Sequence, residues 1–486
     1  MQRGVLIPAA ARTAKRAVIA TLAFVGVPLA FVSASPAAWS PPQGIASSNA
    51  GQYSRPQVAR NAAGDTVAAW YRLGPSGKDE SGALEAATRR AGGGWSAPVR
   101  LASGHLGATA PTVVIDPRGE ATVAWELSTT FAEKGKKRAG ERVAVEVRSD
   151  RAGGGGWGRT VTLASTREPG SSGSVPDPQS AVDGRSDVSV AFQLREHDTT
   201  PVNGREDVLL FTRHGGRWHG PKVVGHTVNS SETQLALDGR GETILAWNHG
   251  GPSGSREQWV QALVLARNGK DEGRAQVLSS KHGTAYALDL AASSSGAAVL
   301  AWSQELPEGQ GLGPAQAVTR PAGGRFSHKT VTLLGKSSPP VVTIDRQGTA
   351  TALFERAVTR GRNEADARGA LEAATHPANG GWSKPQPIAA EGDPQALASG
   401  PHEELLALWE AGFQPAGQPP QARPVIDASI RPAGGTWPPP ATISPERTSE
   451  GSTDLALAAD GKVTAIWVRE PAYATYLIET ADYQPG

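Results

Sequence analysis

The sequence predicts an all-β protein, an eight-bladed β-propeller of four-stranded antiparallel blades. Three observations carry this prediction: an aromatic residue that recurs near the ends of strands, short apolar runs between turn residues, and an N-terminal fragment that matches part of the repeat. The recurring aromatics, after which we number units 1 to 8, are Trp70, Trp125, Phe192, Trp247, Trp302, Phe354, Trp409 and Trp467. They are 52 to 67 residues apart, and such a period with four strands per unit is typical of propeller blades.

Unit 2 shows the predicted strands most clearly. Its four apolar runs are rich in β-branched residues and cover residues 111–115, 121–125, 143–148 and 159–163. The turn Asp116-Pro117-Arg118-Gly119 separates the first two strands, and a glycine run, Gly153 to Gly156, leads to the fourth. Similar turns recur between the first and second strands of the other units, so we expect one face of short turns and one of long loops.

A second series of aromatics precedes the fourth strands: Trp95, Trp157, Trp218, Phe326, Trp382 and Trp437. Unit 4 lacks this signal, so seven blades plus a degenerate one is an alternative. Unit 8 ends after its third strand, whereas residues 39–46 match the fourth strand of unit 1 at 95–102. The sequence therefore predicts one domain, residues 39–486, whose last blade is completed by residues 39–47. This closure removes exposed strand edges.

The first 34 residues are predicted to be a signal peptide. Four basic residues precede an apolar run at 17–32, and Val32-Ser33-Ala34 fits a small-residue cleavage site. Cleavage after Ala37 is the alternative. The apolar run is short for a membrane span, so we expect a secreted, extracellular protein with no stable span after cleavage.

Charge and composition limit the partners and cofactors that we expect. Cleavage would remove four basic residues and no acidic one, which changes the formal net charge from +2 to −2 and gives no electrostatic case for nucleic acid. The chain has no cysteine, so it has neither disulfides nor thiolate metal sites. We expect a monomer without metal or cofactor, stabilised by burial and ring closure.

Polar residues follow the first series of aromatics, where each second strand approaches the long-loop face. We predict that they form a candidate ligand-binding rim for a protein or glycan on the cell envelope or outside the cell. The alternative is that they are solvated strand ends that pair with one another and contribute little. The rim residues are Arg72, Glu126, Arg195, Asn248, Glu305, Glu355, Arg356, Glu410 and Arg469.

No motif in the chain assigns a catalytic residue or a metal ligand. The turn aspartates suit capping of their own turns better than calcium binding. The segment from His402 begins like a zinc-protease motif but has Leu406 where the second ligand belongs. Carboxylate pairs for glycoside cleavage have no sequence signature, and Glu126, Glu355 and Glu410 are the first candidates if such a pair exists.

The repeat from Asp116 to Trp125, together with the segment from Gly93 to Pro98, resembles secreted bacterial β-propeller repeat proteins of unassigned function. It is distantly similar to the Asp-box repeats of sialidase-like propellers, without their catalytic motifs. The resemblance implies the fold and export. The function that we predict is an exported, non-catalytic binding propeller that uses its long-loop face. The alternatives are a sialidase-like or other glycoside-acting enzyme and a structural component of the cell envelope.

Overall fold

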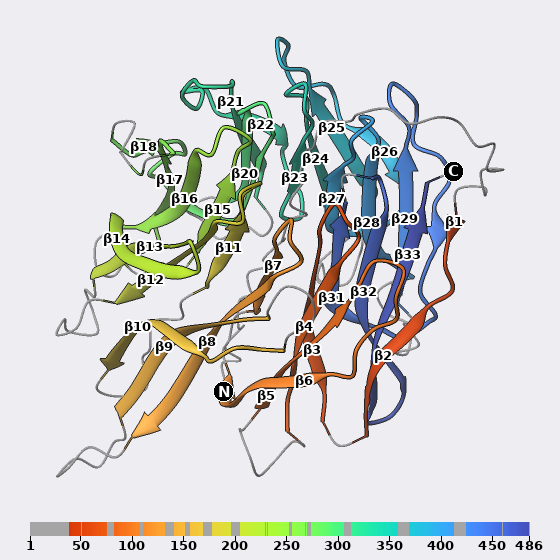
Figure 1. The fold of residues 1–486 in the computed structure, drawn as a ribbon. Coiled ribbons are helices and arrows are strands. Elements are labelled where there is room, and N and C mark those ends of the chain that lie inside the picture. The colour runs from red at the N-terminus through yellow and green to blue at the C-terminus, as the bar shows by residue number, and fades with distance from the viewer. Residues whose placement is uncertain are drawn as a thin grey trace, which may run out of the picture.

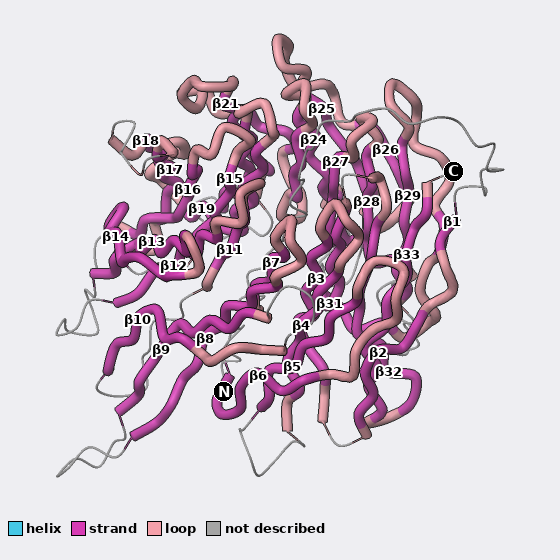
Figure 2. The backbone as a smooth tube through the Cα atoms, in the orientation of Figure 1, coloured by secondary structure: helices cyan, strands magenta, loops and turns pink. Residues whose placement is uncertain are grey.

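A computed structural model of the protein describes residues 38–49, 51–74, 82–106, 110–131, 140–150, 156–168, 177–195, 205–228, 230, 232–251, 255–267, 269, 274–305, 313–357, 369–412, 424–458 and 460–485. All regular structure in these ranges is β-strand, with 33 strands and no helix (Figures 1 and 2). The described part of the chain therefore contains no helix that could span a membrane. The predicted signal peptide lies outside the described residues, and its cleavage stays a prediction.

Each unit begins with a strand that contacts the first strands of its two neighbours. We call these the inner strands. They are β3 (Tyr53–Arg60), β7 (Thr112–Ile115), β11 (Gln179–Val182), β15 (Thr233–Leu237), β19 (Thr284–Ala292), β23 (Val341–Ile344), β27 (Asp393–Ser399) and β31 (Thr448–Leu457). The last of them, β31, contacts the first, β3.

The second and third strands follow in sequence order and pair antiparallel. The second strands are β4 (Thr66–Arg72), β8 (Ala121–Phe131), β12 (Val188–Arg195), β16 (Thr243–Gly250), β20 (Ala298–Glu305), β24 (Ala350–Glu355), β28 (Leu405–Ala411) and β32 (Val463–Ala472). The third strands are β5 (Gly82–Arg89), β9 (Gly140–Ser149), β13 (Arg205–His214), β17 (Gln258–Leu265), β21 (Ala315–Arg320), β25 (Leu371–His376), β29 (Val425–Arg431) and β33 (Thr475–Gln484).

The fourth strands are shorter in several units. They are β6 (Val99–Leu106), β10 (Val161–Glu168), β14 (Arg217–Val228), β18 (Gln276–Val277), β22 (Val331–Leu334), β26 (Gln386–Ala389) and β30 (Ala441–Thr442). Unit 4, which lacks the second aromatic, has only the two-residue strand β18. Two pairings between units, β6 with β8 and β17 with β19, join units 1 and 2 and units 4 and 5 into eight-stranded sheets.

The N-terminal segment pairs with the last strand, as the sequence predicted. Strands β1 (Ala38–Trp39) and β2 (Gln43–Ser48) both lie antiparallel to β33, with Trp39 opposite Tyr483 and Gln43 opposite Thr480 (Figure 1). The pairing is interrupted between β1 and β2, which the sequence did not indicate. Unit 8 and the N-terminal segment thus form a five-stranded sheet.

The apolar core lies between neighbouring units. The first-series aromatics are each at most 1% exposed, because they stand on second strands that are covered on both faces. Each apolar cluster joins residues of adjacent units, for example Val260 of unit 4 with Trp302 of unit 5. One cluster packs Trp70 of unit 1 against Ile466 and Ile478 of unit 8. Burial therefore holds units 1 and 8 together as it does the other neighbours.

The turn aspartates have the capping role that the sequence predicted. Asp116 Oδ1 accepts hydrogen bonds from the backbone N–H groups of Arg118 and Glu120, at 2.9 and 2.7 Å. Gly119 of this turn has a φ of +82°, which favours glycine. The inner strands are thereby tied to the second strands by short turns at one end of the molecule, which we call the turn end. The opposite end is the long-loop end.

Candidate functional site

Three of the predicted rim arginines are paired with a glutamate of their own sheet. Arg72 contacts Glu85 at 2.8 Å, and Arg356 makes two hydrogen bonds to Glu372 at 2.9 and 2.7 Å. Arg469 makes two to Glu479, at 3.0 and 2.8 Å. These glutamates lie on third strands, directly opposite the aromatic of the second strand. The arginines therefore stabilise pairs of strands within their units.

Four other rim residues are buried inside second strands rather than in loops. Glu126 is 3% exposed, Asn248 4%, Glu355 6% and Glu410 0%. The second strands continue past their aromatics, so the residue that follows each aromatic packs in the interior. The structure does not gather these four at an open surface. Arg195 lies 3.7 Å from Glu206, and Glu305 is half-buried at the end of β20. As ligand contacts, all nine remain a prediction.

Two carboxylates that the sequence analysis missed lie where the chain enters inner strands at the long-loop end. Asp177 and Glu232 precede β11 and β15 and are 7% and 9% exposed. Each is six residues before its turn aspartate, Asp183 or Asp238. Their shared position six residues before the turn aspartate could have drawn attention to them in the sequence. The other units have different residues at this position.

Glu232 joins three units. Its Oε1 accepts the backbone N–H of Leu288 in unit 5 at 2.5 Å, and its backbone carbonyl accepts Nε2 of Gln193 in unit 3 at 2.8 Å. Asn248 of its own unit donates to Oε2 at 3.4 Å. Glu232 is therefore fixed at the long-loop end between the inner strands of adjacent units.

Burial raises the pKa of Glu232 to about 8, and the negative charges of Asp177 and Asp289 add to this shift. Hydrogen bonds from the backbone of Leu288 and Ala287 oppose it. The raised pKa favours the protonated, neutral form of the Glu232 carboxyl. Burial likewise raises the pKa of Tyr71, with Glu126 and Asp177 adding to the shift. We call Tyr71, Glu126, Asp177 and Glu232 the acidic cluster.

The inner strands also line a central cavity of about 570 Å³. All eight inner strands contribute to its lining, which extends to the turn end. Polar groups alternate there with small apolar side chains, and the polar ones include Gln57, Thr112, Gln179, Gln234, Thr343, Ser399 and Asp454. Among the described residues, no group of three histidine or acidic side chains could hold a metal ion.

No protein-family model matches the chain, and no curated protein matches its sequence. Similar solved structures include a polysaccharide lyase described as an ulvan lyase, with 13% identity, a TM-score of 0.46, and coverage of 87% of this chain and 92% of the other. An α-L-arabinofuranosidase from Fusarium graminearum has 13% identity, a TM-score of 0.39, and coverage of 79% and 94%. A protein of unknown function from Dyadobacter fermentans has 11% identity, a TM-score of 0.37, and coverage of 70% and 98%.

These comparisons correct the prediction of function. The sequence pointed to a non-catalytic binding protein, whereas two of the similar structures reported above are a polysaccharide lyase and an α-L-arabinofuranosidase. We therefore do not retain the non-catalytic prediction. That prediction rested on the lack of a recognisable motif, and a carboxylate pair for glycoside cleavage has no sequence motif.

Proposed function

We propose that the eight units form one closed propeller. A contact that repeats between inner strands supports this proposal. Thr112 of unit 2 accepts the backbone N–H of Ser180 in unit 3 at 3.2 Å, and Asp289 of unit 5 accepts that of Val342 in unit 6 at 2.6 Å.

The same contact joins unit 8 to unit 1. Asp454, at the equivalent place in unit 8, accepts the backbone N–H of Val58 at 2.9 Å. The junction at which the chain is not continuous thus repeats the geometry of internal junctions. The pairing of β2 with β33 and the contact of β31 with β3 agree with closure.

We further propose that the protein is an exported glycoside hydrolase whose reaction centre is the acidic cluster. The observation that carries this proposal is the burial of two carboxyls, Asp177 and Glu232, at the entries of neighbouring inner strands, where the charge of Asp177 helps to raise the pKa of Glu232. A general acid must hold a proton at working pH, while its partner carboxylate stays charged, and buried carboxyls with different surroundings provide this difference. Export, predicted from residues 1–34, would place the enzyme where polymeric glycans are found.

In the proposed reaction, Glu232 donates its proton to the glycosidic oxygen as the bond to the anomeric carbon breaks. Asp177 acts at that carbon, either through a water molecule or by direct attack, according to the separation of the two carboxyls in the complex. In the water-mediated route, the hydroxyl of water joins the anomeric carbon, Asp177 takes the remaining proton, and exchange with solvent restores both carboxyls. In the direct route, Glu232 takes the proton of the water that cleaves the ester between the sugar and Asp177, which restores both carboxyls. Tyr71 and Glu126 would hydrogen-bond sugar hydroxyls beside the pair.

The test is release of reducing ends from a panel of plant, algal and bacterial polysaccharides. Glu232→Gln preserves the size of the side chain and an oxygen for the Leu288 N–H, so the fold should persist while kcat falls at least about 100-fold. Asp177→Asn should have a similar effect. In the wild type, kcat should decline as pH rises through about 8, because Glu232 then loses its proton.

The matched control is Asp116→Asn, which changes a buried carboxylate that is 3% exposed and serves its own turn. This variant should retain full activity. Glycan cleavage that is unaffected by Glu232→Gln in a folded protein would refute the assigned reaction centre.

A further inference from the structure

The turn end of the central cavity carries positive charge. Arg185 of unit 3, Arg240 of unit 4 and Arg346 of unit 6 all line the cavity there. Arg185 and Arg346 belong to units 3 and 6, so they line the turn end of the cavity from different sides. The two side chains make no hydrogen bond or ion pair with any described residue.

The aspartates of the same turns are already engaged. Asp183 Oδ1 accepts the N–H groups of Arg185 and Asp187, each at 2.9 Å. In the turn of Arg346, Asp345 Oδ1 accepts the N–H of Thr349 at 2.8 Å. Because these carboxylates bond the backbone, the two guanidinium groups of Arg185 and Arg346 remain available for an anion from solution.

The wall of the cavity has unused hydrogen-bonding groups. Gln234 Nε2 and Ser399 Oγ have no partner among the described residues, although their side chains are only 3% and 1% exposed. Both residues line the cavity. A buried polar group without a partner is unfavourable, so a ligand oxygen that reached these groups would recover the lost free energy.

We propose that the central cavity binds an acidic saccharide, with its oxyanion at Arg185 and Arg346 and its ring or hydroxyl oxygens at Gln234 and Ser399. The cavity volume of about 570 Å³ is within the range of ligand pockets. This inference rests on the proposed function only for the ligand class, because Arg185 and Arg346 lie at the opposite end of the inner strands from the acidic cluster. The oxyanion is a carboxylate or a sulfate ester, both of which arginine pairs bind well.

The experiment is titration calorimetry of the full chain with galacturonate, galactose 6-sulfate, galactose and sodium sulfate. Galacturonate or galactose 6-sulfate should bind at least about tenfold more tightly than galactose and than sulfate alone. The tighter binder of these two acidic sugars identifies the oxyanion as a carboxylate or a sulfate ester. Equal binding of galactose would overturn the proposal. Sulfate binding as tight as that of the sugars would also overturn it, because the wall would then contribute nothing.

Paired variants locate the site. Arg185→Gln with Arg346→Gln should weaken binding of the acidic sugar by about 10- to 100-fold. Arg118→Gln is the matched control, because Arg118 has the same place in the turn of unit 2 as Arg185 in unit 3 but does not line the cavity. An equal loss in the control would assign the effect to general surface charge and refute the site.

The wall residues supply a second readout. Gln234→Met and Ser399→Ala should weaken binding about tenfold while the unfolding midpoint stays unchanged or rises, since each removes an unpaired buried group. A lowered midpoint with unchanged affinity would mean that both residues are structural and would overturn their assignment. Calorimetry of Glu232→Gln separates this inference from the proposed hydrolase activity. If the acidic sugar binds but neither the wild type nor a variant cleaves any glycan, the cavity site stands and the hydrolase proposal fails. If glycans are cleaved but no acidic sugar binds, only the hydrolase proposal stands.

Discussion

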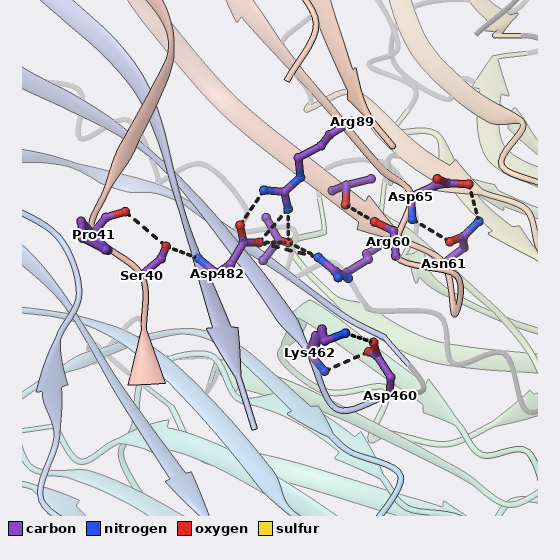
Figure 3. Close-up of polar contacts among 12 residues, drawn as sticks. Ser40, Pro41, Arg60, Asn61, Asp65, Arg89, Asp460, Lys462 and Asp482 are labelled. Carbon is purple, nitrogen blue, oxygen red and sulfur yellow. Dashed lines mark hydrogen bonds and ion pairs between the residues drawn. The ribbon is translucent and has the colours of Figure 1, made fainter. Parts of the chain in front are cut away.

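The junction between units 4 and 5 and the junction between units 8 and 1 each contain an ion pair between an arginine and a carboxylate of the preceding unit. In both, the arginine of a third strand lies opposite the first residue of the second strand and reaches a carboxylate of the preceding unit. Arg320 of unit 5 contacts Glu242 at 2.6 Å and Asp238 at 3.7 Å. Arg89 of unit 1 bonds Asp482 of unit 8 at 2.5 and 2.7 Å (Figure 3).

The difference lies in where the carboxylates come from. Glu242 and Asp238 belong to the turn of unit 4, which the chain connects directly to unit 5. Asp482 belongs to the last strand and also accepts Thr464 Oγ1 at 2.6 Å, while its backbone N–H donates to Ser40 Oγ at 3.0 Å (Figure 3). Where no peptide joins two units, one residue therefore holds the first unit, the last unit and the N-terminal segment together.

The largest expected effect is from deletion of residues 38–48. The deletion exposes the edge of β33 and removes Trp39 and Ile45 from the apolar clusters that they pack against. We expect loss of the cooperative unfolding transition, or a transition lowered by more than about 10 °C, in calorimetry. A synthetic peptide of residues 38–48 should restore part of the loss. An unchanged transition would show that the closing junction does not need the segment.

A smaller effect separates the two arginines. Arg320→Met leaves Asp238 and Glu242 buried together without a cation, and should cost about 3–5 kcal/mol of unfolding free energy. Arg89→Met should cost about 1–3 kcal/mol, because the Asp482 side chain is 21% exposed and keeps Thr464 as a donor. Urea denaturation measures both. Arg118→Met, on an exposed turn, should stay within about 0.5 kcal/mol. The reverse order of the two arginines would contradict the comparison.

The smallest effect concerns pH. Burial favours the neutral form of Asp482, but its hydrogen bonds from Arg89 and Thr464 outweigh burial and lower its pKa. Its contribution to stability is therefore present above the unfolded value near 3.8 and is lost as pH falls. Burial and nearby Glu242 raise the pKa of Asp238 to about 6, so its contribution is present in acid and is lost as pH rises through about 6.

Unfolding free energies of Asp482→Asn and Asp238→Asn between pH 3 and 7 test this contrast. The deficit of Asp482→Asn relative to the wild type should shrink at the acid end. Asp238→Asn should instead flatten the profile around pH 6. If the unfolding free energies of the two variants changed with pH in parallel, the predicted difference between the two junctions would be wrong.

Much of the scaffold could be predicted from the sequence because it repeats. The aromatic period located the second strands, and the match of residues 39–46 to 95–102 predicted the pairing with β33. Register across strands was not predictable, because the loops between second and third strands vary in length. The pairing of Trp70 with Glu85, and with it the contact between Arg72 and Glu85, was therefore missed.

The acidic cluster was hidden for a different reason. Asp177 and Glu232 are in connecting segments where the units differ, and neither belongs to a motif. The raised pKa of Glu232 depends on packing between units 4 and 5 and on the charge of Asp289, which is 57 residues away in the sequence. Such proximity follows from the assembled units and not from one repeat.

The bond between Asp482 and Ser40 spans 442 residues, so it has a consequence for how the molecule is made. Residues 38–48 leave the ribosome long before their partner strand, β33, is synthesised. During synthesis, unit 1 and residues 38–48 are formed before β33 is present, so the contacts between units 8 and 1 can form only at a late stage of folding.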